Sequence, residues 1–453
     1  MADTTRKKEM DMVNGPLFGK LVRFTIPVIL SGILQLLFNA CDIVVVGRFA
    51  GHQSLAAVGS TSSLCNLFVA VFMGLSVGAN VIIAQLYGAG EKDRVKDAVH
   101  TSIAIALISG IFMVVVGVAS ASSVLKLMSS PDDVIELATL YLRIYFLSVP
   151  SMLVYNFGAS ILRAVGNTKT PLYFLTIAGV ANVLLNLFLV IQFSMGVAGV
   201  AIATVFSQTL SAIMMLWYLS MRTDELHFSY KDLKVDNQIL IKIMKVGLPA
   251  GIQGSLFSFS NVIIQSSVNS FGSIVIAGNS AASNLEGFVY FSMNAVYQTA
   301  LTFAGQNYGA GKYKRILKVL FECLAIVTVI GLVLGNATYL FGHSLLSIYN
   351  TDEQVIAAGL VRLSYICTIY FMCGVMDTLV GVLRGVGNSF IPMICSLTFA
   401  CGFRIVWIFT IFQIYHTTEM LYITYILSWV LTSIAHVIVF TITYRRIVKN
   451  RPL

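Results

Sequence analysis

Long apolar runs separated by short polar segments occupy most of this 453-residue chain. Twelve of the runs are long enough, as helices, to cross a hydrocarbon layer about 30 Å thick. Polar and apolar residues do not alternate within them, which excludes the strands of a membrane barrel. The pattern therefore predicts twelve membrane-spanning helices, at residues 17–46, 55–87, 95–121, 135–163, 171–193, 195–221, 240–269, 278–308, 315–343, 355–384, 392–414 and 419–444.

The composition strengthens this prediction. The chain is 57% hydrophobic and only 11% charged, whereas about a quarter of the residues in a soluble domain are charged. The seven cysteines lie in or beside apolar runs without metal spacing or a disulfide pattern, so we expect small buried side chains. The N-terminus lacks a signal-peptide cleavage site, so the first run is expected to remain as a helix.

Basic residues are distributed unevenly between the two sides that twelve spans define. Of the 29 Lys and Arg residues, 24 fall at the chain ends or in even-numbered loops, two fall in odd-numbered loops, and three lie inside spans. Loops rich in Lys and Arg face the cytoplasm. The asymmetry predicts that both termini are cytoplasmic, and it explains the pI of 9.1 without a nucleic-acid partner.

The two halves of the chain repeat one another. Two hexapeptides recur at an offset of 221 residues: Gln85-Leu-Tyr-Gly-Ala-Gly90 as Gln306-Asn-Tyr-Gly-Ala-Gly311, and Leu162-Arg-Ala-Val-Gly-Asn167 as Leu383-Arg-Gly-Val-Gly-Asn388. Near the start of each half the offset is 222, which pairs Pro27 with Pro249 and Asn39 with Asn261. A nearly constant offset over most of a half is not expected by chance, so the chain contains an internal duplication.

Each half contains six predicted spans, an even number, so both halves enter the membrane from the same side. The repeat is therefore parallel, about an axis normal to the membrane. We predict an all-α membrane protein of two six-helix bundles related by a pseudo-two-fold axis. The expected lobes are residues 1–221 and 240–453, joined by a cytoplasmic linker at 222–239. A cleft between two such bundles can open to either side in turn.

The repeated glycines are expected to end helices. Gly88-Ala-Gly90 and Gly309-Ala-Gly311 both follow apolar runs, and a glycine in the left-handed conformation commonly stops a helix. No strand precedes these motifs and no Gly-Lys-Ser/Thr follows them, which excludes a phosphate-binding loop.

The repeated motifs also carry a resemblance. Gln-x-Tyr-Gly-Ala-Gly after spans 2 and 8, with Leu-Arg-x-Val-Gly-Asn after spans 4 and 10, resembles the multidrug and toxic compound extrusion (MATE) family over nearly the whole chain. Pro27 and the run Phe38-Asn-Ala-Cys-Asp42 are similar to its DinF-like bacterial branch. The resemblance implies a secondary antiporter that exports drug-like, often cationic molecules as protons or sodium ions enter.

Asp42, in the first span, is the main candidate for binding the coupling ion. A charge at the centre of a membrane helix costs about 2.5–3.5 kcal/mol on translocon scales, so it needs a partner or a wet cavity. Gln35 and Asn39 precede Asp42 on nearly the same helical face. The resemblance gives this position the role of coupling acid; the alternative is a structural aspartate that forms hydrogen bonds at a helix end.

The resemblance places a partner site on the fifth span. The family pattern there is Asn-x-x-x-Asp, whereas this chain has Asn182 and Asn186, so an amide replaces the second acid. Amide oxygens can ligate sodium or orient a protonated Asp42, and plain packing is the alternative. On the fourth span, Tyr141 fits the tyrosine that the family places near the acid better than Tyr145 does, again with packing as the alternative.

The C-terminal half has buried charges of its own. Glu286 and Asp377 lie inside spans, and Arg404 lies near the middle of another. One hypothesis is a buried ion pair of Arg404 with either acid. The other is a negatively biased substrate cavity that attracts cations, or a second coupling site.

Two further positions in this half have simpler interpretations. Gln253 lies among small residues, so it is expected either to line the cleft or to allow close helix packing. Glu322 follows Lys318 by four residues, so a local ion pair is expected.

Two other functions compete with antiport. A lipid-linked oligosaccharide flippase of the related superfamily would need a strongly cationic cavity, and only Arg404 lies deep in a span. A membrane enzyme would need a nucleophile with a base, a metal cluster or a nucleotide loop, and the sequence shows no such grouping. We therefore predict a monomeric, multi-pass transporter of the bacterial cytoplasmic (inner) membrane. It binds small organic cations or drugs and membrane lipid, and uses no cofactor besides Na⁺ or H⁺ as coupling ion.

Overall fold

A computed structural model describes residues 9–127 and 132–449, and within them every regular element is helical. Four basic residues used to assign the orientation lie outside the described residues: Arg6, Lys7, Lys8 and Arg451. The first half of the chain forms α2 (Phe18–Phe49), α3 (His52–Ala89), α4 (Lys92–Leu127), α5 (Asp132–Ala164), α6 (Lys169–Leu187), the π-helix η1 (Phe188–Gln192) and α7 (Gly196–Ser220).

The second half follows a short 3-10 turn, η2 (Tyr230–Asp232). It forms α8 (Asn237–Asn269), α9 (Ser273–Gly309), α10 (Tyr313–Leu340), α11 (Gly342–Ser347), α12 (Glu353–Ile366), η3 (Cys367–Ile369), α13 (Phe371–Gly385), α14 (Phe390–Ser396), the π-helix η4 (Leu397–Gly402), α15 (Phe403–Phe409), α16 (Ile411–Ile414) and α17 (Thr418–Lys449).

Each predicted span corresponds to one helix or to one run of consecutive helical segments. Among the described residues, ten helices are long and apolar enough to cross a membrane. The pair Glu353–Ile369 and Phe371–Gly385, bent by 46°, is an eleventh candidate. The remaining predicted span is α9, which has 37 residues but is too polar to be selected by hydropathy. All twelve predicted helices are thus present.

The helices form two compact units. Unit 1 contains the described residues up to Asp11 together with Leu30–Gly251, and unit 2 contains Met12–Ile29 together with the described residues from Ile252 onward. The boundaries therefore fall inside α2 and α8, at two positions that the offset of 222 makes equivalent. Each half thus contributes the first part of its first helix to the other unit. The functional lobes at 1–221 and 240–453 stay a prediction.

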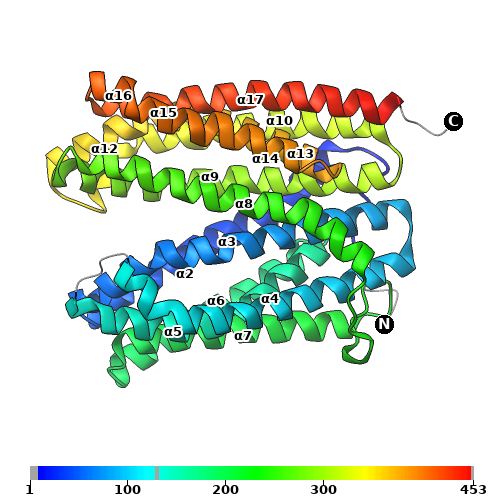
Figure 1. The fold of residues 1–453 in the computed structure, drawn as a ribbon, viewed down its shortest axis with the longest axis horizontal. Coiled ribbons are helices and arrows are strands. Elements are labelled where there is room, and N and C mark those ends of the chain that lie inside the picture. The colour runs from blue at the N-terminus through cyan, green and yellow to red at the C-terminus, as the bar shows by residue number, and fades with distance from the viewer. Residues whose placement is uncertain (1–8, 128–131, 450–453) are drawn as a thin grey trace. The chain divides into compact units, whose positions relative to one another are not determined.

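Within each unit the helices pack lengthwise, as Figure 1 shows. In unit 1, α5 lies against α3, α4 and α7, and in unit 2, α9 lies against α10, α12 and α13. Glycines allow the first part of α8 to approach α3 closely. A Cβ at Gly74 would lie 2.2 Å from the backbone nitrogen of Gly251, and one at Gly78 would lie 2.4 Å from the carbonyl oxygen of Ile243. Larger side chains would separate these backbones.

The repeated glycine motifs end helices, as predicted. Gly90 and Gly311 have φ values of +77° and +68°, a conformation that favours glycine. The second hexapeptide ends its helices in the same way, with φ values of +90° at Gly166 and +89° at Gly387. The duplication in sequence is therefore matched by a duplication of four helix ends.

The segment between the halves is anchored in unit 1. The backbone N–H of Asp236 donates to Oγ1 of Thr101 at 3.0 Å. Arg222, at the start of the segment, is buried and paired with Glu9 and Asp224. Burial opposes the charged form, but the hydrogen bonds and charges of Asp224 and Glu9 outweigh it and hold the pKa of Arg222 above its ordinary value.

Candidate functional site

In unit 1, a glycine on α6 determines where α2 packs. A Cβ at Gly179 would lie 1.8 Å from Cε2 of Phe38, so the Phe38 ring occupies the space that a larger residue would need. Asp42 follows Phe38 by about one turn, and Asn182 and Asn186 follow Gly179 by about one and two turns. The contact therefore places Asp42 beside the two asparagines.

Asp42 accepts a hydrogen bond from Asn186. The donor is Nδ2 of Asn186, which also lies 3.5 Å from Oδ1 of Asn182. Both asparagines are buried, and Oδ1 of Asn186 has no hydrogen-bond partner among the described residues. Within the same residues Asp42 forms no ion pair. The cluster offers carboxylate and amide oxygens, which can hold a proton or ligate sodium.

Tyr141 lies at the edge of this cluster. Its ring stacks on Tyr145 with centroids 6.0 Å apart, and it packs against an apolar cluster that includes Val46 and Val190. It is close enough to Asp42 for an electrostatic interaction. The structure thus supports the packing role of Tyr141 directly and leaves a role at the acid as a proposal.

Asn39 and Gln35 are not drawn into the cluster. Both side chains are exposed in the structure, and neither forms a hydrogen bond with Asp42 among the described contacts. Gln35 and Asn39 share a helical face with the acid, but its hydrogen bond comes from Asn186 on α6.

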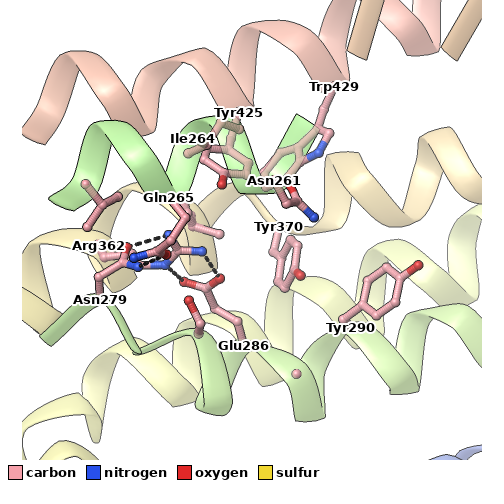
Figure 2. A pocket seen from close by; sticks show the side chains of 14 residues that line it. Asn261, Ile264, Gln265, Asn279, Glu286, Tyr290, Arg362, Tyr370, Tyr425 and Trp429 are labelled. Atoms are coloured by element: carbon pink, nitrogen blue, oxygen red, sulfur yellow. Dashed lines mark hydrogen bonds and ion pairs between the residues drawn. The ribbon is translucent and has the colours of Figure 1, made fainter. Parts of the chain in front are cut away.

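Unit 2 contains a cavity of about 310 Å³. Its wall is built from α8, α9, α12 and α17 and the turn at η3, and Figure 2 shows these side chains. Polar and aromatic groups dominate the wall: Asn261, Gln265, Asn279, Glu286, Tyr290, Arg362, Tyr370, Tyr425 and Trp429. The volume is at the lower end of the range for sites that bind drug-sized molecules.

An ion pair lies in the wall of this cavity. Nε and Nη2 of Arg362 donate to the two carboxylate oxygens of Glu286, each at 2.7 Å, and Nη1 donates to Oδ1 of Asn279 at 2.7 Å (Figure 2). The two charged side chains are only 8% and 6% exposed. This corrects the expectation that Glu286 pairs with Arg404, because the fork of Arg362 occupies both carboxylate oxygens.

Arg404 lies behind the cavity wall. Its guanidinium is 4.4 Å from the ring centroid of Tyr425, and its Nε donates to Oγ of Ser428 at 2.9 Å. The side chain is 3% exposed and forms no ion pair in the described part of the chain. The expected pair with Asp377 is therefore absent there; an aromatic face and a hydroxyl accompany the cation instead.

Gln253 and Asp377 lie outside the cavity wall. Oε1 of Gln253 accepts a hydrogen bond from Nη2 of Arg384 at 2.9 Å, and Nη1 of Arg384 donates to the hydroxyl of Tyr297 at 2.6 Å. Gln253 thus belongs to a buried polar network that stabilises unit 2. Asp377 is half-buried on α13. Of the predicted cavity residues, Glu286 lines this cavity and Arg404 touches its wall from outside.

Sequence reasoning missed Arg362, Tyr425 and Trp429 as members of one site. They lie on α12 and α17, and no local motif connects them to Glu286 on α9. The internal repeat indicates one of them. The offset of 221 pairs Arg362 with Tyr141, which the resemblance places near the acid of the first half.

Comparisons with known proteins agree with the duplicated helical architecture. A family model described as MatE matches the chain twice, at residues 27–188 and 249–410. The "Probable multidrug resistance protein YoeA" of Bacillus subtilis is 29% identical over 381 residues, which are 83% of this chain and 82% of that protein. The "Multidrug export protein MepA" of Staphylococcus aureus is 20% identical over 380 residues, 83% of each protein.

A solved structure shares the fold over almost its whole length. The crystal structure of MATE in complex with MaL6 superimposes with a TM-score of 0.91 at 20% identity, covering 97% of this chain and 99% of that one. The likeness confirms the predicted fold class and agrees with the family match.

Proposed function

Because the chain belongs to the MatE family, we propose that it is a secondary antiporter. It exports lipophilic, often cationic drugs or toxic organic compounds in exchange for protons or sodium ions. Family membership and multiple apolar helices make it a multi-pass membrane protein. The finer proposals are a location in the bacterial cytoplasmic membrane, cytoplasmic termini, a monomeric state and no enzymatic activity.

The observation that carries this proposal is the environment of Asp42. Its carboxylate lies within a membrane helix, beside amides and without an ion pair in the described residues. A carboxylate balanced by a fixed cation would gain little from binding a further cation. A carboxylate held by Asn186 can take up a proton or sodium ion and release it again, which is what a coupling site requires.

The proposed cycle uses these residues in a defined order. The coupling ion binds Asp42, with the amides of Asn182 and Asn186 orienting the carboxylate or supplying oxygen ligands. Binding changes the charge between α2 and α6, so the packing of α2 on α6 differs between the two states. The inward ion contributes about 2.3 kcal/mol per charge for each 100 mV of membrane potential.

Ion dependence of efflux tests the proposal directly. Cells that express the chain and are loaded with ethidium are expected to lose the dye faster than cells that carry the empty vector. Efflux driven by protons should stop when a protonophore is added. Efflux driven by sodium should persist with the protonophore and stop when sodium is replaced by potassium. Equal dye loss from both cell types would refute drug export.

The contact between Phe38 and Gly179 yields a second prediction. Gly179→Val adds a side chain where the Phe38 ring lies, so either the ring must turn aside or α2 must move away from α6. We expect ethidium efflux to fall about tenfold or more, since misplacement by about 1 Å can cost 10²-fold at a functional site.

A compensating change serves as the control for this prediction. Phe38→Ala in the Gly179→Val background removes the clash and should restore a large part of the efflux. Membrane levels of the variants are measured in parallel. Undiminished efflux by Gly179→Val would show that the spacing of α2 and α6 does not matter for transport.

A further inference from the structure

The two units place different chemistry at equivalent positions of the repeat. The offset of 221 pairs Tyr141 with Arg362 and Cys65 with Glu286. The offset of 222, which applies near the start of each half, pairs Asp42 with an isoleucine that lines the unit 2 cavity. The acid that unit 1 carries on its first helix is therefore missing from unit 2. Unit 2 has instead a buried ion pair between the carboxylate of Glu286 and the guanidinium of Arg362.

The charge of the unit 2 cavity wall is not negative. The only carboxylate among the lining residues, Glu286, has both oxygens bonded to Arg362. Arg404 adds a positive charge 4.4 Å from the ring of Tyr425, which lines the cavity. No carboxylate of the described residues forms an ion pair with Arg404. The lining charges of Glu286 and Arg362 therefore cancel, and the charged groups just outside the wall are Arg404, beside Tyr425, and Asp377, whose charge acts on Tyr290.

Arg362 can also bind a ligand without releasing Glu286. A guanidinium has five N–H groups, and three of these are used, two by Glu286 and one by Asn279. Two N–H groups are left for a further acceptor. Because the pair lies in the cavity wall (Figure 2), a bound anion would meet directional, charged donors there.

The rest of the wall suits the apolar part of such a ligand. Tyr370 stacks on Trp429 with ring centroids 5.3 Å apart, and Tyr425 lies 5.9 Å from the same tryptophan ring. These rings line one side of the cavity together with aliphatic residues such as Ile264. An aromatic surface beside a basic group is complementary to an amphipathic anion.

We propose that the unit 2 cavity binds the carboxylate or sulfonate group of an amphipathic organic anion. Arg362 is the hydrogen-bond donor, and Arg404 supplies the positive charge that balances the anion. The proposal rests on the proposed export function and adds aromatic organic anions to the exported compounds. In this division of roles, Asp42 in unit 1 holds the coupling ion, and the two arginines of unit 2 select a substrate group of opposite sign.

Three probes with the same fluorophore distinguish the effect of ligand charge from that of ligand shape. They are dansylglycine, its neutral methyl ester and the cation dansylcadaverine. Their binding is measured by fluorescence on the purified full-length protein in phosphatidylcholine nanodiscs. Arg404→Gln is expected to weaken dansylglycine binding about tenfold, and Arg404→Lys, which keeps the charge, to weaken it by less than about threefold. The methyl ester should respond to neither change.

Glu286→Gln tests whether the cavity favours a ligand of negative or of positive charge. The change leaves an amide that can still accept from Arg362, and it raises the net charge of the wall by one. We expect dansylglycine to bind about tenfold more tightly and dansylcadaverine to bind no more tightly than to wild type. Asn39→Ala changes an exposed side chain in the other unit, serves as a control and should leave dansylglycine binding unchanged.

The opposite pattern would overturn the proposal. Weaker binding of dansylglycine to Glu286→Gln, or unchanged binding to both Arg404→Gln and Glu286→Gln, would show that the cavity does not recognise anions. Ethidium efflux from cells separates this failure from that of the export function. Efflux without the predicted binding pattern refutes the anion site alone, whereas the binding pattern without efflux of any probe refutes export alone.

Discussion

Replacing Asp42 by Asn is expected to abolish concentrative export while leaving the protein folded. The amide has the shape of the carboxylate and can still pair with Asn186, but it neither takes up a proton nor supplies a charge for sodium. The chain then loses about 2.3 kcal/mol per coupled charge for each 100 mV. Since about 1.4 kcal/mol corresponds to a factor of ten, the ethidium gradient that cells sustain should fall about 50-fold at 100 mV.

The control for this prediction lies on the same helix. Asn39→Ala changes an exposed side chain that forms no hydrogen bond with Asp42 among the described contacts. It should leave efflux within about twofold of wild type at equal membrane levels. Loss of efflux in both variants would indicate general damage to α2, and efflux retained by Asp42→Asn would remove Asp42 from the coupling site.

The second large effect concerns stability. Arg362→Gln leaves Glu286 buried without its cation, and removing one partner of a buried ion pair costs about 3–5 kcal/mol. We expect a marked fall in the midpoint of thermal unfolding of the detergent-purified protein. The double variant Glu286→Gln/Arg362→Gln removes both charges together and should recover most of the loss, since neutral replacement of a buried pair is often tolerated.

A second ion pair of the same chain, more exposed than the first, serves as a reference for this measurement. Lys318 lies 3.7 Å from Glu322, and the two side chains are 61% and 20% exposed. Because exposed pairs contribute about 0–1 kcal/mol, Lys318→Gln should shift the unfolding midpoint far less than Arg362→Gln does. Equal shifts for the two variants, or a double variant no more stable than Arg362→Gln, would contradict the assigned role of the buried pair.

The difference between these two pairs also shows what the sequence alone reveals. Lys318 and Glu322 are four residues apart on one helix, so helical geometry predicts their contact, and the structure confirms it. Glu286 and Arg362 are 76 residues apart on different helices. Their contact depends on how α9 packs against α12, which no local pattern encodes, and the sequence analysis offered only Arg404 as a partner for Glu286, as one of two hypotheses.

The same difference between local and long-range contacts explains why the spans could be predicted from the sequence and the contacts at the site could be predicted only in part. Apolar runs and terminal glycines act locally, so twelve helices and their repeated ends are predictable. Asp42 is recognisable because an acid in an apolar run is costly. Its partner is set by the packing of Phe38 on Gly179. Helical register alone suggested Asn39 as a neighbour, whereas the resemblance pointed to Asn182 and Asn186, and the structure pairs Asp42 with Asn186.

The most direct test of the central claim, that Asp42 couples ion entry to export, uses purified protein in liposomes with an imposed proton or sodium gradient and ethidium at equal concentrations on both sides. Wild type is predicted to accumulate ethidium on one side while the ion gradient lasts. Asp42→Asn is predicted to produce no accumulation under either ion, although it still lets ethidium move down its own gradient. Accumulation by Asp42→Asn to the wild-type level would contradict the claim.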